Sequence, residues 1–267
     1  MQEIISDPFL SERSVAVFFI GNYAGHSATV GDEGMRETVK EEAKAYGDIL
    51  QFDIVENEIR NNTLKVLRML HWLFHESDCG KHAKYIMKVS HDVLLNPRQM
   101  ENMLALLVHE QLDSPLFVMG GLQWNSKPVR NMNSIFYIPE YIYPEDFFGF
   151  TYAAGCAYIM PEITARLIYS VGICVRALYL DDVFLVGYLA NALQIRLVHT
   201  SSISLIKPEH SQENYDNLFI VPDMSPKELD LLWNTIFQIK ESQNDIDYPY
   251  GNKPTVNISK THLQNKY

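Results

Sequence analysis

The chain has 267 residues, of which 47% are hydrophobic and 21% are charged. Such a chain can bury a sizeable core without disulfides or a structural metal, in one large domain or two small ones. Lysine and arginine number 22 against 33 aspartates and glutamates, which gives a net charge of −11 with histidine neutral. Nonspecific nucleic-acid binding depends on surplus cationic side chains, so this balance argues against a nucleic-acid partner.

Targeting and cross-linking signals are scarce in the sequence. Cys79, Cys156 and Cys174 allow one disulfide at most and have no CxxC spacing. No run reaches the roughly 18 apolar residues that a membrane helix needs, and residues 1–14 lack the basic and apolar regions of a secretion signal. Composition alone therefore predicts a soluble protein without a targeting segment.

Strand and helix patterns alternate through the first half of the chain. The run at 14–21 (SVAVFFIG) is short and apolar and ends in glycine, which is typical of a buried strand. Leu64, Leu67 and Phe74 recur at spacings of three and four, which indicates an amphipathic helix. We predict strands at 14–21, 48–54 and 84–89, and helices at 34–46, 63–75 and 97–111.

The second half continues this alternation around an aromatic segment. Residues 135–150 are crowded with tyrosine, phenylalanine and proline, which predicts a long ordered loop. We predict strands at 116–119 and 196–199, and helices at 161–171, 183–193 and 226–240. The alternation favours a single α/β domain, a sheet flanked by helices, over residues 14–240. The remaining ends, 1–13 and 241–267, are expected to be flexible.

Two acidic motifs carry candidate chemistry. Ser90, His91 and Asp92 follow the strand predicted at 84–89, and ligands of open α/β sheets lie beyond strand ends. His91 and Asp92 suit Mn²⁺ or Mg²⁺ carrying phosphates, although the local sequence alone favours an Asp92 that caps the following turn and a His91 that is merely exposed. Asp181 and Asp182 precede an apolar helix, where they fit either an N-terminal cap or a general base.

Other signals are weaker or absent. The sequon at 61–63 matters only in a secreted or lumenal protein, and the aromatic run from Phe136 to Tyr152 fits either a sugar-binding cleft or core packing. The sequence contains no GxGxxG, Walker, GxSxG or HExxH motif. Nucleotide dehydrogenases, P-loop enzymes, serine hydrolases and zincins therefore have no support.

Eight short motifs occur in a recognisable order along the chain. They are FFIG at 18–21, YGDIL at 46–50, NTLK at 62–65, AKYIMK at 83–88, PVR at 128–130, YP at 143–144, LDDV at 180–183 and SPKEL at 225–229. In this order they resemble the β-1,3-galactosyltransferase family, which includes β-1,3-N-acetylglucosaminyltransferases and Fringe-like relatives. The resemblance runs from about residue 15 to residue 233.

The resemblance implies a glycosyltransferase A-type fold, a Rossmann-like mixed sheet flanked by helices in a single domain. It implies inverting transfer of a hexose, commonly galactose, from a UDP-sugar to the 3-hydroxyl of a glycan acceptor, in protein or lipid glycosylation. Mn²⁺ would be the cofactor, and the Golgi lumen or membrane the location. Membrane association would require an anchor that this chain does not contain.

The resemblance also implies roles for individual residues. Asp182 would be the general base, and Asp181 a supporting acid. Asp92 and His91 would hold the metal, and Asn61 would carry a glycan. The expected nucleotide- or acceptor-binding residues are Lys88, Ser90, Arg130, Tyr152 and Gly155.

Three departures from the family pattern support an alternative function. Ser90 stands where the family has a leading carboxylate, and Pro222 stands where it has a histidine. The family's anchor and first strand have no counterpart before Ser14. The alternative is a catalytically weakened or inactive homologue that acts as a sugar- or partner-binding protein.

Overall fold

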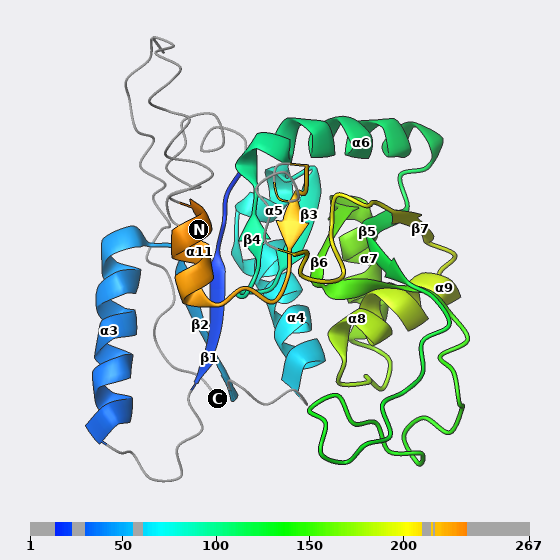
Figure 1. Cartoon of the computed structure of the whole chain (residues 1–267), viewed down its shortest axis with the longest axis horizontal. Helices are drawn as coiled ribbons and strands as arrows, with labels where there is room; N and C mark the ends of the chain where they lie inside the picture. Colours follow the sequence, from blue (N-terminus) through cyan, green and yellow to red (C-terminus); the bar gives the residue numbers. More distant parts are fainter. Residues whose placement is uncertain (1–13, 23–29, 56–60, 210–214, 216, 234–267) are drawn as a thin grey trace.

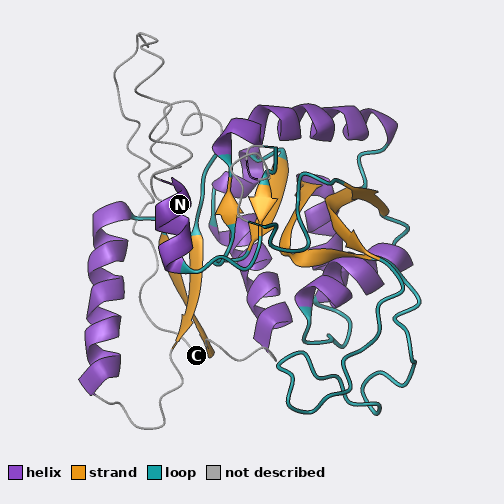
Figure 2. Cartoon of the chain, in the orientation of Figure 1, coloured by secondary structure: helices purple, strands orange, loops and turns teal. Residues whose placement is uncertain are grey.

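The structure is a computed structural model that describes residues 14–22, 30–55, 61–209, 215 and 217–233. Figure 1 shows a mixed sheet in the middle of the molecule, with helices on both of its faces and a two-stranded pair at one side. Figure 2 separates these helices and strands from the long loops that connect them. The α/β class predicted from the sequence is confirmed.

The main sheet has four strands in the order β3-β6-β5-β7. Strand β6 is antiparallel to both of its neighbours, whereas β5 and β7 are parallel, so the sheet is mixed. Their bounds are β3 (Tyr85–Val89), β5 (Phe117–Gln123), β6 (Tyr152–Pro161) and β7 (Arg196–His199). This topology places the carboxyl ends of β3, β5 and β7 and the start of β6 along one edge.

Two smaller sheets flank the main one. Strands β1 (Phe18–Asn22) and β2 (Ile49–Val55) pair in parallel, and β4 (Leu94–Leu95) pairs antiparallel with β8 (Ile220–Val221). Helix α3 (Val30–Tyr46) packs beside β2. In Figures 1 and 2 it stands outside the β1–β2 pair.

The remaining helices are short, and several contain non-α turns. They are α4 (Asn62–His71), the π turn η2 (Trp72–Glu76), α5 (Cys79–His82), the 3-10 turn η3 (Pro97–Gln99), α6 (Met100–Asp113), α7 (Glu162–Gly172), α8 (Asp181–Val183), the π turn η4 (Phe184–Leu189), α9 (Ala190–Ala192) and α11 (Pro226–Leu232). Helix α11 begins with a capping box between Ser225 and Glu228.

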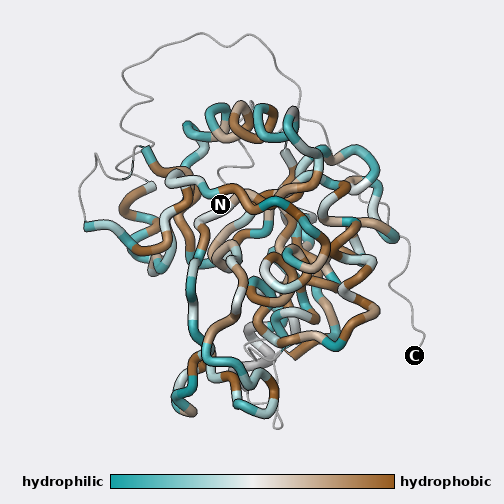
Figure 3. The backbone as a smooth tube through the Cα atoms, turned by 90° about the vertical axis from the view of Figure 1, so that its right-hand side faces the viewer, coloured by the Kyte–Doolittle hydropathy of each residue, from teal (hydrophilic) through white to brown (hydrophobic). Residues whose placement is uncertain are grey.

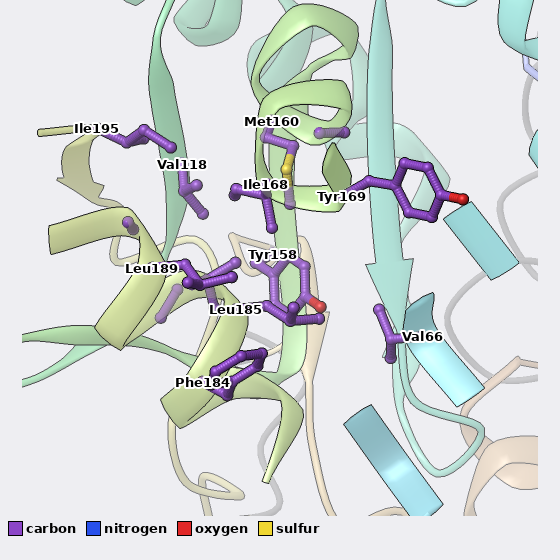
Figure 4. Packing of buried hydrophobic residues seen from close by; sticks show 14 of the residues in the cluster. Val66, Val118, Tyr158, Met160, Ile168, Tyr169, Phe184, Leu185, Leu189 and Ile195 are labelled. Atoms are coloured by element: carbon purple, nitrogen blue, oxygen red, sulfur yellow. The ribbon is translucent and has the colours of Figure 1, made fainter. Parts of the chain in front are cut away.

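Strand alternation divides the core into two layers. Tyr158 and Met160 of β6 belong to the cluster that α4, α7 and η4 cover, and Figure 4 shows how these side chains pack. Ala157 and Ile159 face the opposite way, into a second cluster that α6 covers with Met103 and other residues. In Figure 3, α6 alternates along its length between hydrophobic and hydrophilic residues, as expected for a helix with one buried face.

The sequence missed strand β6, which lies between β3 and β5. Its YAAGCAYIMP run has several small residues of low strand propensity, and it follows a segment predicted as loop. Helix α11 is described from Pro226 to Leu232, and residues from 234 onward, which include the rest of the helix predicted at 226–240, lie outside the described part. The domain limits and the flexible ends stay predictions.

Among the described residues, no helix is long and apolar enough to cross a membrane.

Candidate active site

The candidate site lies at the edge where the strands of the main sheet end. Val89 of β3 pairs with Ala157 of β6, so the turn that carries Ser90, His91 and Asp92 follows at this edge. Strand β6 starts at the same edge, which brings Gly155 close to that turn. The strand-end location predicted for the polar cluster is therefore what the topology produces.

Asp182 meets this edge from the first turn of α8. Its Oδ2 accepts a hydrogen bond from the Gly155 amide at 3.0 Å, and its Oδ1 accepts one from the Val183 amide at 2.8 Å. Leu180, not an acid, is the N-cap residue. The two carboxylates thus occupy the first turn, where the helix amides favour negative charge, and Asp182 is also bound to the sheet.

Gly155 permits this approach because it has no side chain. A Cβ at this position would lie 3.1 Å from Oδ2 of Asp182, which is closer than ordinary van der Waals contact. A Cβ here would require the Asp182 carboxylate to shift by a few tenths of an ångström. Glycine is therefore favoured at this position for space and not for an unusual backbone angle.

Lys88 and Ser90 converge on the other end of the Gly155 peptide. Lys88 Nζ donates to the Gly155 carbonyl at 2.5 Å, and Ser90 Oγ donates to the same oxygen at 3.1 Å. Lys88 Nζ also lies 3.5 Å from Oδ2 of the buried Asp181, and its side chain is only 19% exposed. These two residues, predicted to bind nucleotide or acceptor, thus contact the protein's own backbone and acid.

The electrostatic environment sets the proton affinity of Asp182. Loss of water around its carboxylate, followed by the negative charge of Asp181, raises the pKa of Asp182 from its usual 3.8 to about 6. The Val183 amide, Lys88 and the Gly155 amide act in the opposite direction. Asp182 is half-buried, and its raised pKa allows the carboxylate to take up a proton near neutral pH.

Tyr158 is a member of this group that sequence reasoning did not assign. Its hydroxyl and Oδ2 of Asp181 are both buried and have no hydrogen-bond partner among the described residues. Burial, and then the charges of Asp181 and Asp182, raise the pKa of the Tyr158 hydroxyl well above its usual range. Lys88 Nζ lies 5.8 Å from the Tyr158 ring centroid. Only a prediction of strand β6 would have indicated this residue.

The predicted metal ligands lie in the turn after β3. His91 is exposed, and Asp92 is half-buried. The Asp92 carbonyl accepts a hydrogen bond from the Met224 amide at 2.8 Å, which ties this turn to the segment before α11. No group of three or more His, Cys, Asp or Glu side chains in the described part is placed to hold a metal ion. One carboxylate and one imidazole suit a cation whose other ligands are phosphate oxygens and water.

Arg130 orders the aromatic loop from within. Its guanidinium donates to the carbonyls of Ile138, Tyr143 and Glu145 at 2.7, 2.7 and 2.9 Å. These bonds occupy much of its donor capacity, and its predicted binding role stays a prediction. Part of the loop is core, since Ile138 packs with Leu180 next to the acidic pair.

Tyr152 begins strand β6 at the candidate site. Burial raises the pKa of its hydroxyl, a side-chain hydrogen bond with Ser126 lowers it, and the charge of Asp182 raises it again. Its side chain is half-buried. Tyr152 is therefore within electrostatic reach of Asp182, although its role in acceptor binding stays a prediction.

Trp124 and His199 lie at the same strand-end edge, and neither was assigned a binding role from the sequence. Their rings meet edge to face with centroids 5.1 Å apart, and Trp124 is 54% exposed. The Leu122 amide donates to His199 Nδ1 at 3.3 Å. Trp124 directly follows β5, which extends four residues beyond the strand predicted at 116–119. A strand prediction that reached Gln123 would have placed Trp124 at this edge.

Asn61 directly precedes α4. Its amide donates to the Val55 carbonyl at 3.3 Å. Thr63, the last residue of the sequon, is buried, and its hydroxyl donates to the Leu178 carbonyl at 2.5 Å. Glycosylation of Asn61 stays a prediction.

Comparison with known proteins places this arrangement in a family. The sequence model described as Galactosyltransferase matches residues 6–201. The chain is 29% identical over 226 residues to beta-1,3-galactosyltransferase 1 of Mus musculus and of Homo sapiens, an alignment covering 85% of this chain and 64% of each relative. It is 26% identical over 216 residues to beta-1,3-galactosyltransferase 2 of Mus musculus, covering 78% and 48%.

The family model spans more than half of the chain, whereas the chain itself spans less than two thirds of the length of these relatives. The matched part contains the strand-end turn, strand β6 and the acidic pair of α8. On the sequence match, and in agreement with the mixed α/β fold, the chain belongs to the galactosyltransferase family.

Proposed function

We propose that the chain is an inverting hexosyltransferase that moves a sugar, galactose, from a UDP-sugar to the 3-hydroxyl of a glycan acceptor, in protein or lipid glycosylation. The observation that carries the proposal is the Asp182 carboxylate, which belongs to a half-buried residue, is held by the Gly155 amide and has a pKa raised to about 6. A general base needs these properties.

In the proposed reaction Asp182 takes the proton of the acceptor hydroxyl. The hydroxyl oxygen forms a bond to the anomeric carbon of the sugar from the face opposite UDP. The bond between that carbon and the diphosphate oxygen breaks, and its electron pair leaves with UDP. The Gly155 and Val183 amides fix the carboxylate, so that it meets the hydroxyl without reorganising.

Asp92 and His91 would hold Mn²⁺ together with the diphosphate. When bound, the cation supplies positive charge beside the departing phosphate oxygens. Among the described residues, no group of three His, Cys, Asp or Glu side chains could hold a metal. His91 and Asp92 therefore fit a metal that also binds the UDP-sugar. The Golgi lumen or membrane is the proposed location, by family resemblance.

A sugar- or partner-binding homologue without transfer activity is the second candidate. Ser90, which replaces the leading carboxylate of the family motif, gives its hydroxyl to the Gly155 carbonyl. Ser90 therefore adds no negative charge toward a cation. Within this motif, the exposed His91 is then the other possible metal ligand beside Asp92. This candidate predicts binding of a sugar or UDP without turnover.

The deciding experiment measures UDP-galactose turnover with and without Mn²⁺, in the wild type and in Asp182→Asn. The proposal expects Mn²⁺-dependent turnover that falls by about 10²–10⁴-fold in Asp182→Asn. Active protein whose rate is unchanged in Asp182→Asn would refute the base assignment. UDP binding without turnover of any UDP-hexose would favour the second candidate.

A further inference from the structure

The Gly155 peptide connects two charged groups through opposite ends. Its amide donates to Oδ2 of Asp182, and its carbonyl accepts from Lys88 Nζ. Lys88 also lies 3.5 Å from Oδ2 of Asp181, the residue next to Asp182. One half-buried cation thus contacts both the peptide that holds Asp182 and the acid beside it.

We propose that Lys88 is a positioning residue, which holds the Gly155 peptide and the Asp181 carboxylate so that Asp182 is fixed as the proton acceptor. This inference rests on the proposed function, in which Asp182 is the base. It reassigns Lys88 from the predicted role of binding nucleotide or acceptor. Lys88 acts through its neighbours and does not need to touch either substrate.

Burial and bonding support this assignment over direct substrate binding. The Lys88 side chain is 19% exposed, and its ammonium is engaged by the Gly155 carbonyl and by Asp181. Asp181 is nearly fully buried, and Oδ2 has no hydrogen-bond partner among the described residues. A buried carboxylate without its cation is strongly unfavourable, so a substrate phosphate would have to compete with Asp181 for Lys88.

Charge explains why both contacts matter to Asp182. Asp181 disfavours the ionised form of Asp182, and Lys88 favours it. The other titratable groups that face Asp182 belong to β6, and they are Tyr152, Cys156 and Tyr158. Among the described residues, Lys88 of β3 supplies the positive charge that lowers the pKa of Asp182, so its loss is expected to shift the titration of Asp182 upward.

The test is a carboxyl ¹³C NMR titration of the full chain labelled at aspartate. The Asp182 signal is identified by its absence in Asp182→Asn. We expect a midpoint of about 6 in the wild type and a rise of about 1 pH unit in Lys88→Met. Lys84→Met, the same change at an exposed lysine just before β3, is expected to leave the midpoint in place. An unchanged midpoint in Lys88→Met would overturn the proposal.

A second variant pair covers the case in which Lys88→Met does not fold. Asp181→Asn removes the buried acid that needs the cation, so the double variant Lys88→Met/Asp181→Asn contains no unpaired charge at this position. We expect its Asp182 midpoint to lie above that of Asp181→Asn. Equal midpoints in these two variants would overturn the proposal.

Transfer kinetics separate this inference from the proposed function. If the chain transfers hexose, Lys88→Met is expected to lower kcat and to leave the KM for UDP-sugar within about 3-fold. A raised KM with an unchanged kcat and midpoint would show that Lys88 binds the donor. Absence of transfer by the wild type would contradict the proposed function, while the NMR midpoints would still report whether Lys88 acts on Asp182.

Discussion

The two acidic motifs of the chain look alike in sequence but differ in structure. Asp181 and Asp182 are held between α8 and the sheet, because Asp182 accepts a hydrogen bond from the Gly155 amide and Asp181 forms an ion pair with Lys88. His91 is exposed in a turn, with Asp92 half-buried beside it. A carboxylate fixed by several elements suits proton transfer, whereas a carboxylate in a turn suits a cation that arrives with its ligand.

The largest expected contrast concerns rescue by metal. Asp92→Ala is expected to raise the Mn²⁺ concentration needed for half-maximal transfer by at least ~10-fold, because it weakens metal binding. Asp182→Asn is expected to lower the rate by about 10²–10⁴-fold at every Mn²⁺ concentration, because it removes the base. Transfer assays over a Mn²⁺ series measure both. If excess Mn²⁺ restored the transfer rate of Asp182→Asn, the proposed difference in role between the two motifs would be contradicted.

Gly155→Ala tests the close approach of β6 to Asp182. The added methyl group would lie 3.1 Å from Oδ2, so the carboxylate must shift. We expect kcat to fall by about 10²-fold, the cost of a misplaced catalytic group. Gly34→Ala is the matched control, since a Cβ there meets nothing within 4 Å. Wild-type kcat in Gly155→Ala would show that the position of Asp182 is not critical.

Asp182 is also expected to destabilise the fold at neutral pH. Because folding raises its pKa from 3.8 to about 6, the folded state binds this proton more tightly than the unfolded state. The resulting stability is complete below pH 3.8 and is lost as the pH rises through 6. Asp182→Asn avoids this loss and is expected to increase the free energy of unfolding by about 2 kcal/mol at pH 7.5, and by much less at pH 4.

Urea denaturation of both proteins at the two pH values measures this effect. The Asp92→Asn variant, changed at the other motif, is the control. If Asp182→Asn gave the same change in unfolding free energy at pH 4 and at pH 7.5, the raised pKa of Asp182 would be contradicted.

The smallest expected effect concerns the capping box at the start of α11. Lys207 and the capping box with Ser225 lower the pKa of Glu228 to about 2. Its contribution to stability is therefore present above the ordinary pKa of 4.5 and is lost as the pH falls toward 2. Glu228→Gln is expected to lower Tm slightly at pH 7, whereas Asp230→Asn on the exposed face is not. Calorimetry that found equal Tm values for the wild type and Glu228→Gln would argue against this cap.

The sequence predicted the parts of the site that depend on local pattern. Strand β3 was recognisable from its apolar run, and the polar residues after it were correctly expected at a strand end. The helix that follows Asp182 was recognisable from its continuous apolar residues, although η4 forms a π turn within it. Burial of Asp181 could not be predicted, because it depends on which residues pack over the first turn.

The sequence could not predict the contacts that depend on long-range pairing. Gly155 and Tyr158 gain their roles only because β6 pairs between β3 and β5, and the small residues of β6 conceal this strand. The partners of Arg130 are backbone carbonyls, which no residue type reveals. Tertiary pairing, and not local propensity, decided these features.

The most direct test of the central claim is the pH dependence of kcat/KM for the acceptor. If Asp182 is the base, kcat/KM is constant at neutral pH and falls tenfold per pH unit below a midpoint of about 6. In Asp182→Asn the residual rate is expected to lack this midpoint. A wild-type profile without a midpoint between about pH 5 and pH 7, or the same midpoint in Asp182→Asn, would contradict the account.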